Sequence, residues 1–161
     1  MSKKKEEKTN VMRILDRAKI PYTPHIYDPD QGLDGVSVAR QLGQDPARVF
    51  KTLVARGASG GCYVFAIPAA ESLDLKKAAA AVGEKSVAML SQKELLPLTG
   101  YVHGGCSPVG MKKPFPTLFH ETAEGLETVC VSAGKIGAQV EADPRALSAL
   151  LGAGTADIVV E

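Results

Sequence analysis

Two apolar stretches joined by a glycine-rich turn are the feature that most constrains the fold of this 161-residue chain. Residues Phe50 to Ala55 and Cys62 to Ile67 are rich in apolar, β-branched and aromatic side chains, which favour strands. The sequence Gly57-Ala58-Ser59-Gly60-Gly61 between them is a strong turn signal. We therefore expect an antiparallel hairpin around which the rest of the chain is arranged.

Short helix and strand signals alternate irregularly along the remaining chain. Helix starts are indicated by a capping Thr9, a capping box of Ser91 and Glu94, and Asp143-Pro144 before the last helix. The spacing is too irregular for a regular βαβ series. The sequence therefore predicts an α/β fold, with a mixed, largely antiparallel, barrel-like sheet of about seven strands and helices packed outside. We expect residues 9–161 to form a single domain after a disordered charged tail over residues 1–8.

Composition excludes several classes of protein. The formal net charge of +1 is too small for strong electrostatic binding of nucleic acid. Trp is absent, which argues against a surface on which single-stranded bases stack. The charged N-terminus does not resemble a secretory signal, and no apolar run approaches the length of a membrane span. Three cysteines without a C-x-x-C pair do not form a disulfide framework. We therefore expect a cytoplasmic protein with no membrane partner.

Lys51 lies inside the first apolar strand, where a lysine is unusual unless its amine reaches water, a carboxylate or a bound anion. The functional interpretation is a cation that binds an anionic group, or the charge that develops in a transition state. The alternative is a lysine whose amine reaches solvent from a strand edge. Residue chemistry alone favours the two equally.

Two glycine-rich loops are the most irregular stretches of the chain. The first is Gly104-Gly105-Cys106-Ser107-Pro108-Val109-Gly110 and the second is Ser132-Ala133-Gly134-Lys135-Ile136-Gly137. Paired glycines let the backbone approach a ligand closely, and consecutive N–H groups in such turns can bind an anion. The alternative is two tight turns without a ligand. Neither loop matches a dinucleotide or Walker pattern.

The cysteines and histidines indicate neither a metal site nor a catalytic dyad. Cys106 lies in the first glycine loop, but neither His103 nor His120 is obviously placed to act as its base. Cys62 and Cys130 fall in apolar strands and are expected in the core. No Cys/His spacing fits zinc, so we expect no metal and no cofactor.

Three stretches in order resemble the motifs of the YbaK/EbsC family. Phe50-Lys51-Thr52-Leu53 is similar to its F-K-T-L strand, the first glycine loop to its G-G-x-S-P-x-G loop, and the second to its S-x-G-K-x-G loop. The resemblance extends from about Asn10 to the end of the chain, with the motifs at the family's spacing. It implies a barrel-like mixed sheet with flanking helices and no metal.

The YbaK/EbsC family contains deacylases of misacylated tRNA and the editing insertion of bacterial prolyl-tRNA synthetases. The resemblance therefore implies trans-editing deacylation, with Cys-tRNA(Pro) as the expected substrate. The expected partners are an aminoacyl-tRNA 3′ end and prolyl-tRNA synthetase. Because no protein base is evident, the resemblance also suggests that the substrate thiol attacks its own ester and forms a thiolactone. Water attack is the alternative.

The same resemblance implies the residues of the site. Lys51 and the backbone N–H groups of Gly104 and Gly105 are expected to be catalytic, because they can hold the tRNA 3′ end and the developing oxyanion. Some relatives carry an aspartate where this chain has Gln139, which can still bond a ribose hydroxyl but has no charge. The expected substrate-binding residues are Tyr27, Ser107, Pro108, Ser132, Gly134 and Gln139.

Three other functions fit the sequence. The substrate could instead be Ala-tRNA(Pro) or another small aminoacyl ester, since pocket volume decides between small amino acids. A non-catalytic module that binds aminoacyl-tRNA or a nucleotide is a second alternative. A synthetase partner with a vestigial site is a third. Lys51 and the two intact glycine loops favour an enzyme over the last two.

Overall fold

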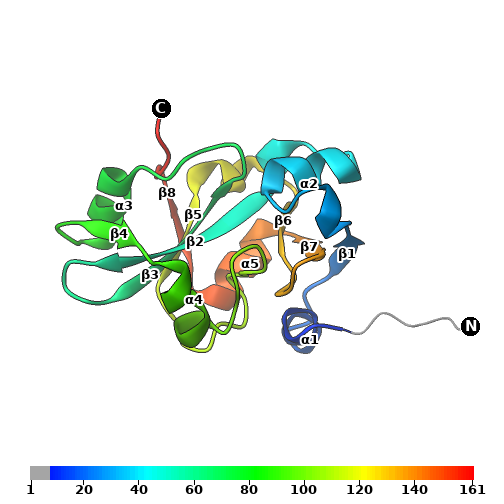
Figure 1. The fold of residues 1–161 in the computed structure, drawn as a ribbon, viewed down its shortest axis with the longest axis horizontal. Helices are drawn as coiled ribbons and strands as arrows, with labels where there is room; N and C mark the ends of the chain where they lie inside the picture. The colour runs from blue at the N-terminus through cyan, green and yellow to red at the C-terminus, as the bar shows by residue number, and fades with distance from the viewer. Residues whose placement is uncertain (1–7) are drawn as a thin grey trace, which may run out of the picture.

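The computed structural model describes residues 8–161, whose eight strands form two sheets (Figure 1). The larger sheet has the strand order β4-β2-β3-β5-β8, and the smaller has the order β1-β7-β6. The strands are β1 (Tyr22–Ile26), β2 (Phe50–Gly57), β3 (Cys62–Pro68), β4 (Val87–Met89), β5 (Thr117–His120), β6 (Val129–Ser132), β7 (Ala138–Ala142) and β8 (Gly154–Ala156).

Five α-helices within residues 8–161 surround the sheets, and side chains cap three of them where the sequence predicts. Thr9 accepts a hydrogen bond from the Met12 N–H, and Ser91 and Glu94 form the predicted capping box. Asp143 caps the last helix, which begins at Pro144. The helices are α1 (Asn10–Arg17), α2 (Gly35–Leu42), α3 (Leu75–Val82), α4 (Gln92–Thr99) and α5 (Pro144–Leu151).

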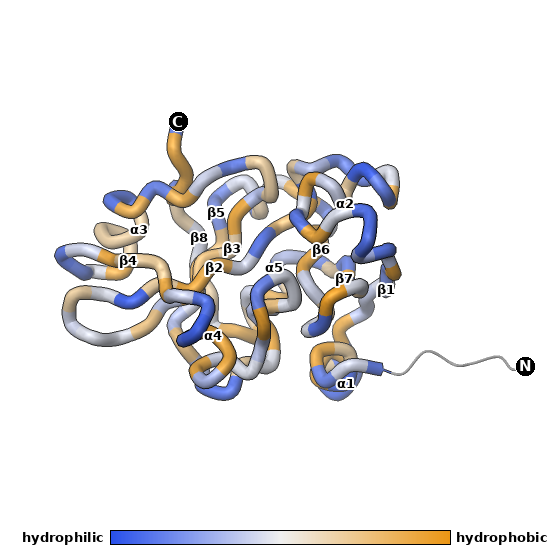
Figure 2. The backbone as a smooth tube through the Cα atoms, viewed as in Figure 1, coloured by the Kyte–Doolittle hydropathy of each residue, from blue (hydrophilic) through white to orange (hydrophobic). Residues whose placement is uncertain are grey.

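The predicted hairpin is confirmed, because β2 and β3 pair antiparallel with Lys51 opposite Ile67. β3 then pairs parallel with β5, and β5 pairs parallel with β8. The larger sheet is therefore mixed, whereas every pair of the smaller sheet is antiparallel. In Figure 2 hydrophobic stretches follow β3 and β6, and both strands contribute residues to the core.

The mixed α/β fold is as predicted, but its barrel-like detail is not confirmed, because residues 8–161 contain two sheets and no closed ladder of strands. Outside the named strands, one parallel bridge between Val49 and Cys130 connects the two sheets. The sheets instead bury apolar side chains in a shared core, to which α1 and α5 also contribute. That core includes Leu15, Val54, Val64, Phe119, Val129, Val131, Val140 and Leu147.

The predicted charged tail over residues 1–8 lies almost wholly outside the described residues, which begin at Lys8. The Lys8 ammonium contacts the Asp16 carboxylate at 2.6 Å on the surface of α1. Each of the five helices described has eight residues, and none is long and apolar enough to cross a bilayer.

Candidate functional site

A cavity of about 450 Å³ lies between the two sheets, where β2 passes α2 and the first glycine loop. Its size is that of a typical small-ligand site, and most of its walls are apolar. The polar exceptions are few and come from separate elements, which is the usual pattern of a binding pocket. They include Tyr27, Asp34, Lys51, Thr52, His103, Ser132 and Gln139.

Lys51 extends from β2 into this cavity. Burial is the largest influence on its amine and lowers the pKa, while the carboxylates of Glu71 and Asp34 act in the opposite direction. Among residues 8–161, no carboxylate lies within 4.0 Å of the Lys51 Nζ atom. The structure therefore leaves a partly buried cation in the cavity without a close counter-charge.

The two glycine loops pack directly against each other. A Cβ atom added to Gly105 would lie 3.1 Å from the Ile136 backbone nitrogen and 3.2 Å from the Lys135 backbone. Gly104 has a φ of +90°, a left-handed conformation that favours glycine, and it lines the cavity. The absence of side chains at both positions thus brings the loops into contact at the edge of the cavity.

The N–H groups of the paired glycines differ in their hydrogen bonds. Gly105 N–H donates to the Val102 carbonyl at 3.0 Å, so it is used within its own turn. The Gly104 N–H donates to no acceptor among residues 8–161. Of the two donors, the Gly104 N–H is therefore the one that is not used in a turn, and Gly104 is the one of the two residues that lines the cavity.

Tyr101 supports both glycine loops from beneath. Its ring lies where a Cβ on Gly134 would approach at 3.2 Å, and its hydroxyl donates to the Val109 carbonyl. Burial raises the pKa of the Tyr101 hydroxyl to about 12, so this donor keeps its proton at physiological pH. No sequence pattern marks Tyr101 for this role, although it stands just before the first glycine loop.

Polar side chains at the far wall are only partly satisfied within the protein. The Gln139 Oε1 accepts from Gln44 Nε2 at 2.6 Å, and Gln139 is 4% exposed. The Ser132 hydroxyl accepts from the Gly134 N–H at 3.0 Å. The Thr52 Oγ1 and the Gln44 Oε1 are buried and have no hydrogen-bond partner among the described residues. Unpaired buried polar atoms are uncommon, and the one on Thr52 belongs to a residue of the cavity wall.

The structure brings together five of the nine predicted site residues. Tyr27, Lys51, Gly104, Ser132 and Gln139 line the cavity. Gly105, Ser107, Pro108 and Gly134 do not line it. Gly105 and Gly134 shape the loops, the Ser107 Oγ accepts from the Val109 N–H, and Pro108 lines a separate cavity of about 320 Å³. The chemical roles assigned to these nine residues stay predictions.

Several cavity residues carry no signal that the sequence analysis used. Asp34 and Gly35 belong to the start of α2, where the Asp34 carboxylate accepts from the Ser37 N–H and hydroxyl. These hydrogen bonds hold the pKa of the Asp34 carboxyl below its usual value. His103 precedes the first glycine loop and is the one imidazole among the residues that line the cavity. An Asp one residue before a helix is a recognisable cap, but its position beside Lys51 is set by the tertiary fold.

The chain belongs to the aminoacyl-tRNA editing domain family, whose model matches residues 33–150. It is 45% identical over 163 residues to a protein of Enterococcus faecalis named "Putative Cys-tRNA(Pro)/Cys-tRNA(Cys) deacylase EbsC". That match covers 100% of this chain and 99% of the relative. The family predicted from the three motifs is therefore confirmed.

Solved structures show the same fold. One, of "a putative trans-editing enzyme for prolyl tRNA synthetase", superposes with a TM-score of 0.81 at 26% identity. The match covers 97% of this chain and 100% of the other. The structure of hypothetical protein APE2540 gives a TM-score of 0.85 at 24% identity, over 93% and 99% of the two chains, and supports the fold alone.

Proposed function

We propose that this protein is a trans-acting deacylase that removes cysteine from Cys-tRNA(Pro). The observation that carries the proposal is the Lys51 ammonium, partly buried in a ligand-sized cavity without a close carboxylate. Such a cation suits the phosphates and the polarised ester at the 3′ end of a charged tRNA. Membership of the editing-domain family and the name of the Enterococcus relative support the same substrate class.

In this proposal the Gly104 N–H stabilises the ester carbonyl oxygen as it gains negative charge. Gly104 lines the cavity with Lys51, and its N–H is free of internal acceptors within residues 8–161. Gly105 has a structural role instead, because its N–H already donates to Val102. A single preorganised donor of this kind is worth roughly 100-fold to 1,000-fold in rate.

The cavity offers an apolar compartment for a small side chain beside these polar groups. Leu53, Leu95 and Cys106 line it together with the hairpin residues. The terminal adenosine occupies the part near Tyr27 and Ser132, whose aromatic ring and hydroxyl suit a nucleoside. Gln139 contributes an amide, held by Gln44, for a ribose hydroxyl.

The bond-breaking step is intramolecular. The thiol sulfur of the cysteinyl ester attacks its own carbonyl carbon, and the carbon–oxygen bond to the terminal ribose breaks. The thiol proton is transferred to the released ribose oxygen. The products are therefore deacylated tRNA, with a free ribose hydroxyl at its 3′ end, and a cyclic thiolactone. The protein supplies position and charge stabilisation only, which agrees with a cavity that lacks paired carboxylates. The enzyme is then a lyase in type, whereas attack by water would make it a hydrolase.

His103 makes hydrolysis the one specific alternative, because an imidazole on the cavity wall can act as a general base toward water. Replacement of the substrate thiol by a hydroxyl distinguishes the two routes. Thiol attack predicts that Ser-tRNA(Pro) is stable and that His103→Ala retains activity toward Cys-tRNA(Pro). Undiminished turnover of Ser-tRNA(Pro), together with loss of activity in His103→Ala, would establish the water route instead.

A deacylation assay with a panel of charged tRNAs tests the function itself. Purified protein is incubated with Cys-, Ala- and Pro-tRNA(Pro), and the remaining ester is measured over time against spontaneous hydrolysis. We expect rapid loss of the cysteinyl ester and no effect on the prolyl ester. Preference for Ala-tRNA(Pro) would reassign the amino acid. A folded protein that accelerates loss of no ester, yet binds charged tRNA, would support the non-catalytic module.

The proposal includes a cytoplasmic location and a weak association with prolyl-tRNA synthetase. The net charge of +1 supports this arrangement, because so nearly neutral a protein gains little affinity for tRNA from counterion release. A synthetase that presents the 3′ end would compensate. Addition of the synthetase should therefore lower the tRNA concentration needed for half-maximal deacylation.

A further inference from the structure

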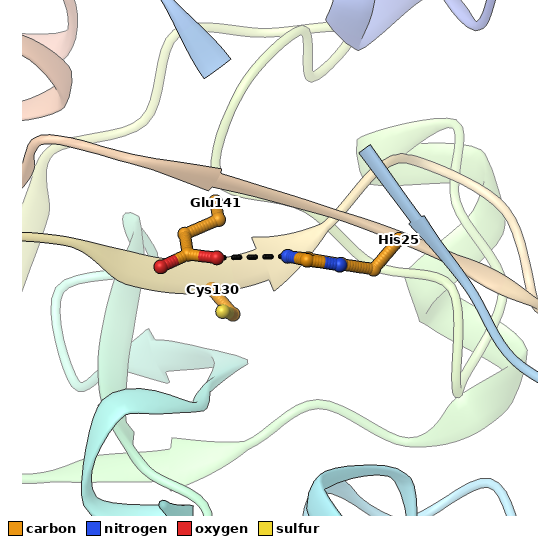
Figure 3. A group of neighbouring side chains, drawn as sticks. All are labelled: His25, Cys130 and Glu141. Atoms are coloured by element: carbon orange, nitrogen blue, oxygen red, sulfur yellow. Dashed lines mark hydrogen bonds and ion pairs between the residues drawn. The ribbon is translucent and has the colours of Figure 1, made fainter. Parts of the chain in front are cut away.

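Three potential metal ligands from three different strands meet beside the cavity (Figure 3). His25 comes from β1, Glu141 from the central strand β7, and Cys130 from β6. Cys130 lies directly opposite Glu141 in the sheet, and His25, which pairs with Gln139, lies diagonally across from Glu141, two residues along the strand from Thr23. Their donor atoms all lie within 4.8 Å of one another, and no other group of this kind is found among residues 8–161.

The donor set suits a borderline-soft divalent ion. Imidazole nitrogen, thiolate sulfur and carboxylate oxygen are the three donor types that Zn²⁺ takes in proteins. The His25 Nε2 and the Glu141 Oε1 are 2.8 Å apart and share a hydrogen bond or ion pair. Donors around tetrahedral zinc are separated by about 3–4 Å, so small side-chain movements would admit the ion between all three.

Neighbouring groups hold the carboxylate ligand in place. The Glu141 Oε2 accepts from the Thr128 hydroxyl at 2.5 Å, and Arg48 donates to the Thr128 carbonyl at 3.3 Å. Outer-shell hydrogen bonds of this kind orient carboxylate ligands in metal sites. Cys130 is 2% exposed, whereas the side chains of His25 and Glu141 are 26% and 29% exposed. An ion can therefore enter from the His25 side and reach the sulfur from there.

We propose that His25, Cys130 and Glu141 form a Zn²⁺ site with one coordination position left for water or another ligand. Burial raises the pKa of the Cys130 thiol to about 12, so the bound metal must displace its proton. Cys130 also belongs to the cavity wall, which puts the site next to the substrate cavity. The proposal does not depend on deacylation, since metal affinity is measured on the protein alone. The alternative interpretation of the cluster is a His25–Glu141 ion pair that links β1 to β7 without a metal.

Titration of the metal-stripped full chain with Zn²⁺ and Co²⁺ tests the site. We expect one Zn²⁺ per chain by calorimetry, and a thiolate-to-cobalt charge-transfer band with Co²⁺. Cys130→Ser and His25→Gln should each weaken binding by more than the roughly 10–100-fold that loss of an outer-shell partner costs. Cys62→Ser and Cys106→Ser are matched controls, because they remove the other two buried thiols, and they should retain the band.

Three results would overturn the metal site. The first is that wild type binds Zn²⁺ no more tightly than the Cys130→Ser/His25→Gln double variant does. The second is that the Co²⁺ spectrum of wild type has no thiolate band, and the third is that Cys106→Ser loses this band. Circular dichroism and thermal unfolding confirm that each variant is folded. If Cys130→Ser does not fold, His25→Gln decides the question alone, because that side chain is partly exposed and its loss leaves the core intact.

Discussion

The partly buried charge of Lys51 lowers the stability of the fold in the same place where it can bind a ligand. Its strand neighbours Phe50 and Val54 are buried in the core, yet Lys51 itself is turned into the cavity, where burial lowers its pKa. The folded state then binds this proton less tightly than the unfolded state does. A charge held in this way destabilises the folded state when no anionic ligand is bound.

Lys51→Met should therefore stabilise the protein and abolish deacylation. The folded-state pKa of Lys51 is depressed, so the cost of its charge is fully present below that pKa and disappears as the pH rises toward the unfolded value of about 10.5. The gain in the free energy of unfolding should be largest at neutral pH and should shrink in alkaline solution. Urea denaturation from pH 7 to pH 11 measures it. The exposed Lys76→Met is the control, and an equal gain there would refute the argument.

Site residues differ in how far the sequence reveals them. Lys51 is conspicuous because a charge interrupts an apolar strand. The cluster of His25, Cys130 and Glu141 has no such signal, because metal spacing motifs detect ligands that are close in sequence, whereas 116 residues separate His25 from Glu141. The expectation of no metal rests on Cys/His spacing and on the family resemblance. Gly105 shows a further limit, since its N–H bond to Val102 is visible only in the folded turn.

At the scale of elements, the contact between the two glycine loops sets the edge of the cavity. Gly105→Ala would push a Cβ against the backbone of Lys135 and Ile136, which cannot move aside as a flexible side chain can. We expect a loss of about 1–3 kcal/mol in the free energy of unfolding and a lower deacylation rate, because the loops must separate. Chemical denaturation and the ester assay measure the two effects.

Gly125→Ala is the matched control for the loop contact. No atom lies within 4 Å of a Cβ added there, and Gly125 does not have a positive φ. Its effect on stability should stay within about 0.5 kcal/mol. Equal stability of the two variants would mean that the loops do not depend on their close approach.

The start of α2 positions a second wall of the cavity and is held by the Asp34 cap. Asp34→Ala removes the hydrogen bonds to Ser37 and should cost about 1 kcal/mol at neutral pH. The folded-state pKa of Asp34 is depressed, so the stabilisation by its charge is complete above the unfolded value of about 3.8. It is lost as the pH falls through the lower folded value.

The free energies of unfolding of wild type, Asp34→Ala and Asp34→Asn, measured between pH 7 and pH 2, test this pH dependence. Asparagine still caps a helix but carries no charge, so the gap between wild type and Asp34→Asn should close in acid. A gap that does not change with pH would show that the carboxylate charge has no part in the cap.

Elements with local signals are the ones that the sequence predicts well. Thr9, the Ser91 and Glu94 pair, and the glycine turn after β2 act within a few residues, so the helix starts and the hairpin are found where expected. The parallel pairing of β3 with β5 and of β5 with β8 joins distant segments and has no local mark. The order of strands in the larger sheet therefore cannot be predicted from local sequence signals.

At the scale of the whole molecule, the cavity is lined by residues from both sheets and from the loops between them. The Val49–Cys130 bridge joins them at one place, and the cavity lies beside it, with β2 on one side and the smaller sheet on the other. The barrel-like sheet is expected from the irregular spacing of the elements and from the family resemblance, and neither of these specifies how distant strands pair. The family resemblance, by contrast, rested on three motifs in order and is confirmed over the whole chain.

Single-turnover deacylation of Cys-tRNA(Pro) by wild type and Lys51→Ala tests the account most directly. Lys76→Ala serves as the control, because this exposed lysine of α3 does not line the cavity. We predict that Lys51→Ala lowers the rate by roughly 100-fold or more while remaining folded, and that Lys76→Ala matches wild type. An unchanged rate in Lys51→Ala would contradict the claim that deacylation takes place in this cavity.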